Sequence, residues 1–348
     1  MFSAIQTSEE PWRVSEAAFP GDGTVAQKLR FCLNYAVLAP STRNTQPWLF
    51  KIRGDGLELY ADRTRSLSRV DPDDRELTMS CGAALLHLRL ALRHFGYETQ
   101  VETFPDPADD DLLARVVLGE AREGTPQEHT LFRMILKRHT SRLPFEDLDV
   151  PDKVPPVLQA MARSEGAALH LIAGAEARNL IGDLIETADR IQWADKLVRY
   201  QIAGWLHPRG SSSSDGIPAS AFETDDPLSH VGPEVVRLVN MGAEQAVKDR
   251  RKAVEAPLLA VLTTGGDTPA EWLAAGQAME KVLLCACAAG LSASYLNQPL
   301  EVPALRPQLR GVLAQVLGHQ GCPQLVFRLG YGPEVPPTPR RSVSEVLL

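Results

Sequence analysis

Two stretches of the chain share one pattern: GAALLHLRLALRHFG at 82–96 and GQAMEKVLLCACAAG at 276–290. Each is an apolar helical pattern that begins and ends on glycine, and the two glycine pairs are 194 positions apart. Pro105 and Pro299 keep the same offset. A strand-like stretch ending in glycine then follows in both places. Glycine-capped helices are common, but three positions in register favour an internal duplication over coincidence.

A chain of 348 residues is long enough for two domains of ordinary size, which agrees with a duplication. We expect two related halves, at 24–120 and 121–348, preceded by an aperiodic arm at 1–23. The second half is the longer one because of residues 204–232, which are rich in Ser, Gly and Pro. A segment of this length without a period is either a disordered insert or a lid over a site.

The first half mixes helix and strand patterns. Apolar residues at a spacing of four predict a helix over 25–37, since a residue before Pro40 avoids the helical conformation. The runs 49–52 and 57–62, joined by a Gly/Asp turn, predict a β-hairpin. A long helix from Leu77 then ends at Gly96, and a strand follows. We therefore predict an α+β fold.

The charge balance and the chain's N-terminus limit the kind of protein. Lys and Arg number 36 against 44 Asp and Glu, and the net charge of −8 argues against nucleic acid or anionic membranes as partners. No apolar run approaches the roughly 18 residues that a membrane span requires, and a signal peptide is absent, so we expect a cytoplasmic protein. The five cysteines are expected to be free thiols.

Common site signatures such as GxGxxG, GxxxxGK[ST], HExxH and paired CxxC do not occur. Cys285 and Cys287 would point to different helix faces, which is poor geometry for zinc, so no metal site is expected. The GLSAS sequence at 290–294 lacks the last glycine of a nucleophile elbow. A site would have to be assembled from dispersed loops.

Four segments are candidates for such a site. KRHTSR (137–142) alternates cationic and hydroxyl side chains, which suits a phosphate but also a solvated basic turn. TPRR (338–341) contains an adjacent arginine pair, which by itself indicates only an exposed surface segment. PSTRNTQPW (40–48) offers hydrogen-bonding groups beside a flat tryptophan, or merely caps backbone groups. DRRKAVEAP (249–257) places Lys252 before a buried strand, or on a solvated helix face.

Taken together, and in their chain order of PSTRNTQPW, KRHTSR, DRRKAVEAP and TPRR, the four segments resemble those of flavin-dependent nitroreductases. RHTSRLPF (138–145) and SDGIP (214–218) make the chain similar to the twin-nitroreductase, Acg-like branch, in which one chain carries both halves. The resemblance covers about 24–348. It implies an intramolecular pseudo-dimer of two nitroreductase-like halves, whose C-terminal tail after Pro336 crosses to the first half.

The resemblance also implies FMN as cofactor, bound between the halves. A basic-hydroxyl motif and a C-terminal arginine hold its phosphate and ribityl chain in the family, the proline-serine loop lies along the ring, and a further segment covers the ring near N5. Lys252 matches a position near the N1 and O2 edge, and no catalytic side chain is implied. The expected cofactor-binding residues are Arg138, His139, Thr140, Arg142, Pro40, Ser41, Thr42, Asn44, Lys252, Tyr295, Leu296, Asn297, Gln298, Arg340 and Arg341.

One FMN per chain is expected. The first half has no basic-hydroxyl motif at its start, and the second half has MARSEGA (161–167) where a second proline-serine loop would stand. Because one chain supplies both walls of the site, a monomer can suffice. The expected function is an FMN-dependent NAD(P)H oxidoreductase for nitroaromatic or quinone acceptors. The alternatives are an FMN-binding protein that sequesters flavin under residues 204–232, and a binding module without flavin.

Overall fold

The computed structural model describes residues 10–222, 227–230 and 232–348, and within them the chain forms two four-stranded antiparallel sheets. Both sheets have their strands in the same order of first, second, fourth and third along the chain. The first contains β1 (Trp48–Arg53), β2 (Gly56–Ala61), β4 (Leu112–Ala121) and β3 (Tyr97–Thr103). The second contains β5 (Ala168–Ile172), β8 (Leu258–Thr264), β10 (Cys322–Gly330) and β9 (Ser292–Tyr295). The predicted α+β fold of two related halves is confirmed.

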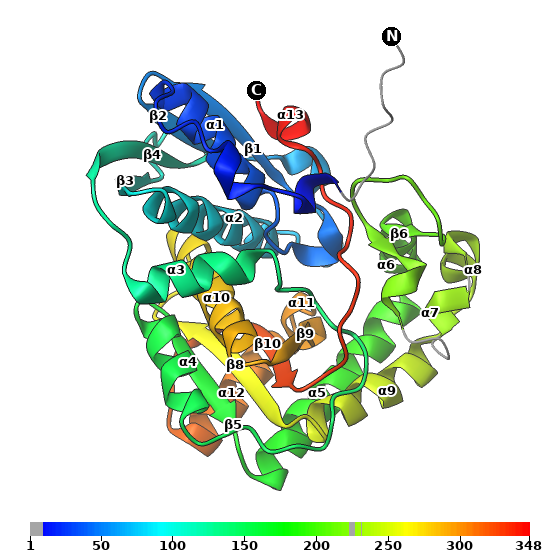
Figure 1. The fold of residues 1–348 in the computed structure, drawn as a ribbon. Coiled ribbons are helices and arrows are strands. Elements are labelled where there is room, and N and C mark those ends of the chain that lie inside the picture. The colour runs from blue at the N-terminus through cyan, green and yellow to red at the C-terminus, as the bar shows by residue number, and fades with distance from the viewer. Residues whose placement is uncertain (1–9, 223–226, 231) are drawn as a thin grey trace.

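The two glycine-bearing helices, α2 (Arg75–His94) and α10 (Pro269–Ala288), pack against each other between the sheets (Figure 1). Their backbones approach so closely that a Cβ on Gly82 would collide with the carbonyl oxygen of Leu273. A Cβ on Gly276 would collide in the same way with the carbonyl oxygen of Met79. Met79 and Leu273 keep the 194-residue offset, so the crossing has the reciprocal contacts of a twofold interface. The duplicated pattern thus builds the contact between the halves.

Equivalent helices precede the two sheets. α1 (Val25–Ala36) leads to β1, and α4 (Val154–Arg163) leads to β5, while α3 (Pro126–Ile135) connects the halves. Thr24 and Thr125 cap α1 and α3, each through a capping box with the residue three positions later. The predicted first helix and β1–β2 hairpin are confirmed, with β1 beginning at Trp48.

The second half carries a large helical insertion between β5 and β8 (Figure 1). It runs from 173 to 257 and so includes more than the predicted 204–232, because α5 and α9 have the ordinary apolar pattern of core helices and give no sign of insertion. Residues 223–226 and 231 of the predicted segment lie outside the described part. The elements are α5 (Ala175–Ala194), α6 (Lys196–Gly204), β6 (Leu206–His207), β7 (Ile217–Pro218), α7 (Pro227–His230), α8 (Pro233–Leu238) and α9 (Gly242–Val254).

The end of the chain returns to the first sheet. After β9 come α11 (Gln298–Glu301) and α12 (Arg306–Leu317), then β10, and an extended tail reaches α13 (Val343–Val346). The tail runs along one side of the molecule from the second sheet to the first (Figure 1). There the backbone N–H of Leu348 donates to the carbonyl of Phe50, at 2.8 Å. Short 3₁₀ turns lie at Glu10–Trp12, Glu16–Ala18, Thr42–Asn44, Arg63–Arg65 and Ala219–Ala221.

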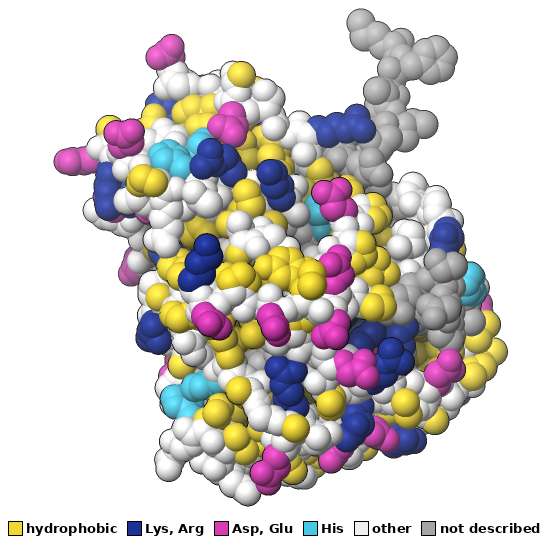
Figure 2. All heavy atoms as spheres, turned by 60° about the horizontal axis from the view of Figure 1, so that its bottom comes forward, with side chains coloured by type: hydrophobic (Ala, Val, Ile, Leu, Met, Phe, Trp, Pro, Cys, Tyr) yellow, Lys and Arg dark blue, Asp and Glu magenta, His cyan; other side chains and the backbone are white. Residues whose placement is uncertain are grey.

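One hydrophobic core extends through both halves, from Trp48 and Phe50 to Leu283 and Phe327. On the face seen in Figure 2, basic and acidic side chains lie interspersed among apolar ones. None of the described helices is long and apolar enough to cross a membrane. The five cysteines are free thiols.

Candidate functional site

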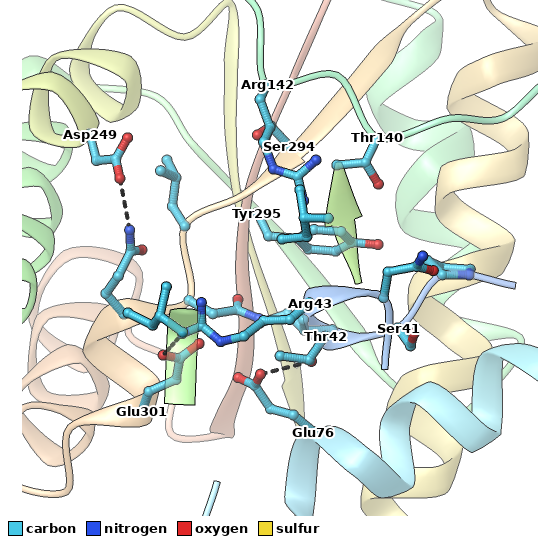
Figure 3. Close-up of a pocket in the computed structure, with 18 of the residues that line it drawn as sticks. Ser41, Thr42, Arg43, Glu76, Thr140, Arg142, Asp249, Ser294, Tyr295 and Glu301 are labelled. Carbon is cyan, nitrogen blue, oxygen red and sulfur yellow. Dashed lines mark hydrogen bonds and ion pairs between the residues drawn. The ribbon is translucent and has the colours of Figure 1, made fainter. Parts of the chain in front are cut away.

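A cavity of about 250 Å³ lies where the two halves and the helical insertion meet (Figure 3). Its walls come from the loop before β1 and from α2 in the first half, and from α5, α9 and the β9–α11 connection in the second. Of the fifteen residues expected to bind a cofactor, these line it: Pro40, Ser41, Thr42, Asn44, Thr140, Arg142, Lys252, Tyr295, Leu296, Asn297, Gln298 and Arg340. Missing from the described lining are Arg138, His139 and Arg341.

The loop at 40–47 has an unusual backbone. Arg43, Asn44 and Gln46 have φ angles of 51°, 56° and 52°, in the left-handed region that non-glycine residues rarely adopt. The hydroxyl of Ser41 accepts a hydrogen bond from the Gln46 N–H at 2.9 Å and closes the turn. Strain of this kind persists only where surrounding contacts hold it, and it concentrates at functional sites.

The C-terminal tail and the insertion supply those contacts. Arg341 donates from its backbone to the side-chain oxygen of Gln46 (2.8 Å) and from its guanidinium to the Gln46 carbonyl (3.0 Å). The guanidinium of Arg340 donates to Oδ1 of Asn44 at 2.9 Å. Asn44 in turn donates to the carbonyl of Gly216 at 2.9 Å. Arg341 therefore lies behind the loop and shapes it, instead of facing the cavity as expected.

One end of the cavity is basic and carries Thr140, Arg142 and Arg340. A hydrogen bond of 2.9 Å from the Ser141 N–H to the carbonyl of Ala293 fixes this segment beside β9. Arg340 is only 4% exposed, and its Nε has no hydrogen-bond partner among the described residues. Burial and then the nearby charge of Arg138 lower the pKa of Arg340 to about 9. A bound anion would relieve both effects.

Arg138 and His139 lie outside the described lining of the cavity, so their role in cofactor binding stays a prediction. The Nε of Arg138 lies 3.1 Å from Oε1 of Glu280, which is fully buried and also pairs with His87 at 2.7 Å. The two groups form a buried ion pair, although the Nε of Arg138 makes no hydrogen bond among the described residues. His139 packs edge-on against Trp12, and burial followed by the charge of Arg138 lowers its pKa to about 3. A motif of alternating residues cannot reveal which of its side chains face inward.

The residues from Tyr295 to Gln298 form a second wall, where β9 leads into α11. The hydroxyl of Tyr295 is buried without a hydrogen-bond partner among the described residues. Oδ1 of Asn297 accepts from the N–H of Val326 at 3.0 Å, which holds the wall to β10. Gln298 donates through Nε2 to Asp249 at 3.0 Å (Figure 3), and Nζ of Lys252 lies 3.7 Å from the same carboxylate.

Sequence reasoning missed the acidic residues of the cavity. Burial and then the charge of Glu301 raise the pKa of Glu76 to about 8, and Thr42 donates to it at 2.9 Å. Burial and then the charge of Asp249 raise the pKa of Asp189 to about 9. The four acids Glu76, Asp189, Asp249 and Glu301 come from four separate helices, so they form no local motif. The available signal was Asp189 itself, an acid within the buried face of α5.

Comparison with known proteins gives consistent relatives. No protein-family model matches the chain. Over 326 residues it is 31% identical to the Mycobacterium tuberculosis protein named "Putative NAD(P)H nitroreductase Rv3131", covering 92% of this chain and 91% of that protein. It is 29% identical to the "Putative NAD(P)H nitroreductase acg" of the same organism, covering 91% and 94%. A solved nitroreductase-type structure from Anabaena variabilis is similar over 95% of this chain and 93% of its own, with 11% identity and a TM-score of 0.47.

Proposed function

The chain belongs to the nitroreductase family, in its Acg-like branch, and on that premise we propose that it binds FMN in the cavity and transfers electrons from NAD(P)H to a small acceptor. The observation that carries this proposal is the composition of the cavity. A basic end from the second half and the tail faces a strained loop from the first half. A cofactor with a phosphate at one end and a flat ring at the other suits that arrangement.

The side chains present fit FMN. Thr140, Arg142 and Arg340 would hold the phosphate, since guanidinium groups match phosphate oxygens in geometry and charge. The Nε of Arg340 and the hydroxyl of Tyr295 are buried groups that a ligand could satisfy. The loop from Pro40 to Asn44 and the wall from Tyr295 to Gln298 would hold the ring.

FMN, when bound, supplies the redox chemistry by accepting a hydride from NAD(P)H and passing two electrons to the acceptor. The protein positions the reactants and shields them from water. Leu206, Ile217, Phe222 and Leu228 of the insertion provide an apolar cover on the cavity. Lys252 brings positive charge to the wall beside Gln298, where it can stabilise negative charge on a ligand. We propose nitroaromatic or quinone compounds as acceptors.

A second candidate function is flavin sequestration. Asn44 and Gln46 accept or donate hydrogen bonds with Gly216 and Ser214, so the insertion is tied to the loop beside the cavity. Phe222 also stacks on the guanidinium of Arg142, 5.5 Å from ring centroid to Cζ. A cover attached at these points favours slow exchange of substrates, and with it a protein that holds FMN without turnover.

One FMN per chain and a monomer are part of the proposal. The halves at 24–120 and 121–348 would each supply one wall, and the segment 164–167 between α4 and β5 is too short to repeat the loop at 37–47. We propose the cytoplasm as the location, because its reducing conditions keep cysteines as free thiols, the state of all five here.

An anaerobic titration tests the proposal and separates its two versions. The FMN-loaded protein receives NADPH and then NADH while the visible flavin absorbance is followed. Rapid bleaching, followed by reoxidation with a quinone, is the expected result for the reductase. Bound flavin that stays oxidised would contradict the reductase function and favour sequestration. A protein that takes up no FMN would overturn both.

A further inference from the structure

Four carboxylates line the cavity in addition to its basic end. They come from α2, α5, α9 and α11: Glu76, Asp189, Asp249 and Glu301. In Figure 3, Asp249 and Glu301 lie on the side away from Thr140 and Arg142. The cavity is therefore basic at one end and acidic at the other.

Three of the four carboxylates have a cationic partner. The distances are 3.0 Å from Arg75 to Glu76, 3.7 Å from Lys252 to Asp249 and 3.8 Å from Arg43 to Glu301. Asp189 forms no ion pair within the described part of the chain, although it is only 2% exposed. Asp189 is thus the acid in this group that the described residues leave without an ion pair, and with a pKa of about 9 it carries a proton near pH 7.

Two acceptor atoms at this end also lack donors. Oδ2 of Asp189 is buried and has no hydrogen-bond partner among the described residues. Oε1 of Gln298 is also buried without a hydrogen-bond partner among the described residues, while Nε2 of the same side chain donates to Asp249. A buried polar atom without a partner is costly, and once Asp189 has released its proton a ligand with several N–H groups would satisfy both atoms.

We infer that the acidic end binds a cationic nitrogen, an ammonium or amidinium group, on the electron acceptor, with Asp189 as its principal partner. That the ligand is the electron acceptor rests on the function proposed above, whereas the cation site itself rests on the contacts of Asp189 and Gln298. NAD(P)H does not suit this end, since its phosphates would meet the carboxylates. The site would select acceptors by charge.

Proton release accompanies this binding. The charged groups that face Asp189 are Asp249 and Lys252 from α9 and Glu301 from α11, and the side-chain amide of Gln298 lies beside it. Burial, followed by the charges of Asp249 and Glu301, raises the pKa of Asp189 to about 9 against the opposite effects of Gln298 and Lys252, so the carboxyl is neutral near pH 7. A bound cation favours the carboxylate, so the proton leaves. Affinity for a permanent cation should rise between pH 6 and pH 9.

Isothermal titration calorimetry of the FMN-loaded full chain tests the inference with benzamidinium and its neutral isostere benzamide. We expect the wild-type protein to bind benzamidinium roughly 10- to 100-fold more tightly, and Asp189→Asn to abolish the preference. Asp183→Asn is the matched control, since Asp183 lies on the same helix, pairs with Arg250 and has a 61% exposed side chain. It should keep the wild-type preference.

Equal affinity for the two compounds in the wild type would overturn the inference, as would a preference that survives Asp189→Asn. If Asp189→Asn does not fold, the wild-type ratio of affinities at pH 6 and pH 9 decides, and a ratio that fails to rise refutes the role of Asp189. Flavin content and bleaching by NADPH are recorded on the same samples. Their failure would count against the proposed function alone, because benzamidinium binding can also be measured on the flavin-free chain.

Discussion

Under the proposed function, we expect phosphate binding to depend most on Arg340. It is buried at the basic end, and its Nε lacks a partner among the described residues. We predict that Arg340→Ala lowers FMN affinity by about 10- to 150-fold, the range for losing a hydrogen-bonded charge. Quenching of FMN fluorescence on titration measures it. Arg251→Ala, on an exposed arginine of α9, is the control, and an Arg340→Ala protein that binds FMN like this control would refute the assignment.

Arg138 should contribute to stability through its ion pair with Glu280. Its removal leaves the buried carboxylate of Glu280 with only His87 as partner. We predict that Arg138→Ala lowers the free energy of unfolding by about 3 to 5 kcal/mol, and that adding Glu280→Gln restores part of the loss. Urea unfolding of the single and double variants measures this. Unchanged stability together with lost FMN binding would show that Arg138 contacts the cofactor.

Asp189 makes stability depend on pH. Its pKa is raised from 3.8 to about 9 in the folded protein, so the folded chain keeps a proton that the unfolded chain releases. The free energy of unfolding therefore falls as pH rises through this range, by up to about 1.4 kcal/mol per pH unit for one group. Asp189→Asn removes this contribution, so its stability relative to wild type should increase from pH 6 to pH 9. Urea unfolding at three pH values checks it, and a constant difference would contradict it.

At the scale of elements, the crossing of α2 and α10 sets the distance between the halves. A methyl group on residue 276 would overlap the carbonyl of Met79, and backbone on both sides cannot move aside cheaply. We predict that Gly276→Ala lowers the free energy of unfolding by about 3 kcal/mol or more. Gly311→Ala in α12 is the matched control, because nothing lies within 4 Å of its added Cβ. Equal effects of the two substitutions on urea unfolding would contradict the role of the crossing.

Elements with a local sequence pattern could be predicted, because residues close together in the chain specify them. The glycine helices and the β1–β2 hairpin are specified by neighbouring residues. The residue types at 40–48 also indicate a loop, but its strained backbone depends on contacts with the distant tail and insertion. The insertion could not be delimited, since α5 and α9 look like any core helices. The direction of Arg138 depends on Glu280, 142 positions away, and the acidic end depends on four helices that meet only in the folded chain. Contacts between distant segments leave no spacing to detect.

At the scale of the whole molecule, duplication followed by divergence accounts for the single FMN site that we propose. The reciprocal contacts at Gly82 and Gly276 preserve the symmetry of the halves. The segments around this contact no longer obey the symmetry, because 37–47 forms a strained loop while its counterpart 164–167 is a short connection. The helical insertion and the tail hydrogen-bond the loop at 37–47. The core of the chain therefore keeps the approximate twofold symmetry of a dimer, whereas the candidate site is asymmetric.

The stoichiometry of FMN binding tests this asymmetry and the assigned cavity together. Flavin-free protein is dialysed to equilibrium against FMN, and bound flavin is counted per 38.0 kDa chain, for the wild type and for Arg340→Ala. We predict one FMN per wild-type chain and a clearly weaker occupancy at the same free FMN concentration in the variant. Two FMN per chain, or none, would contradict a single site built between the two halves.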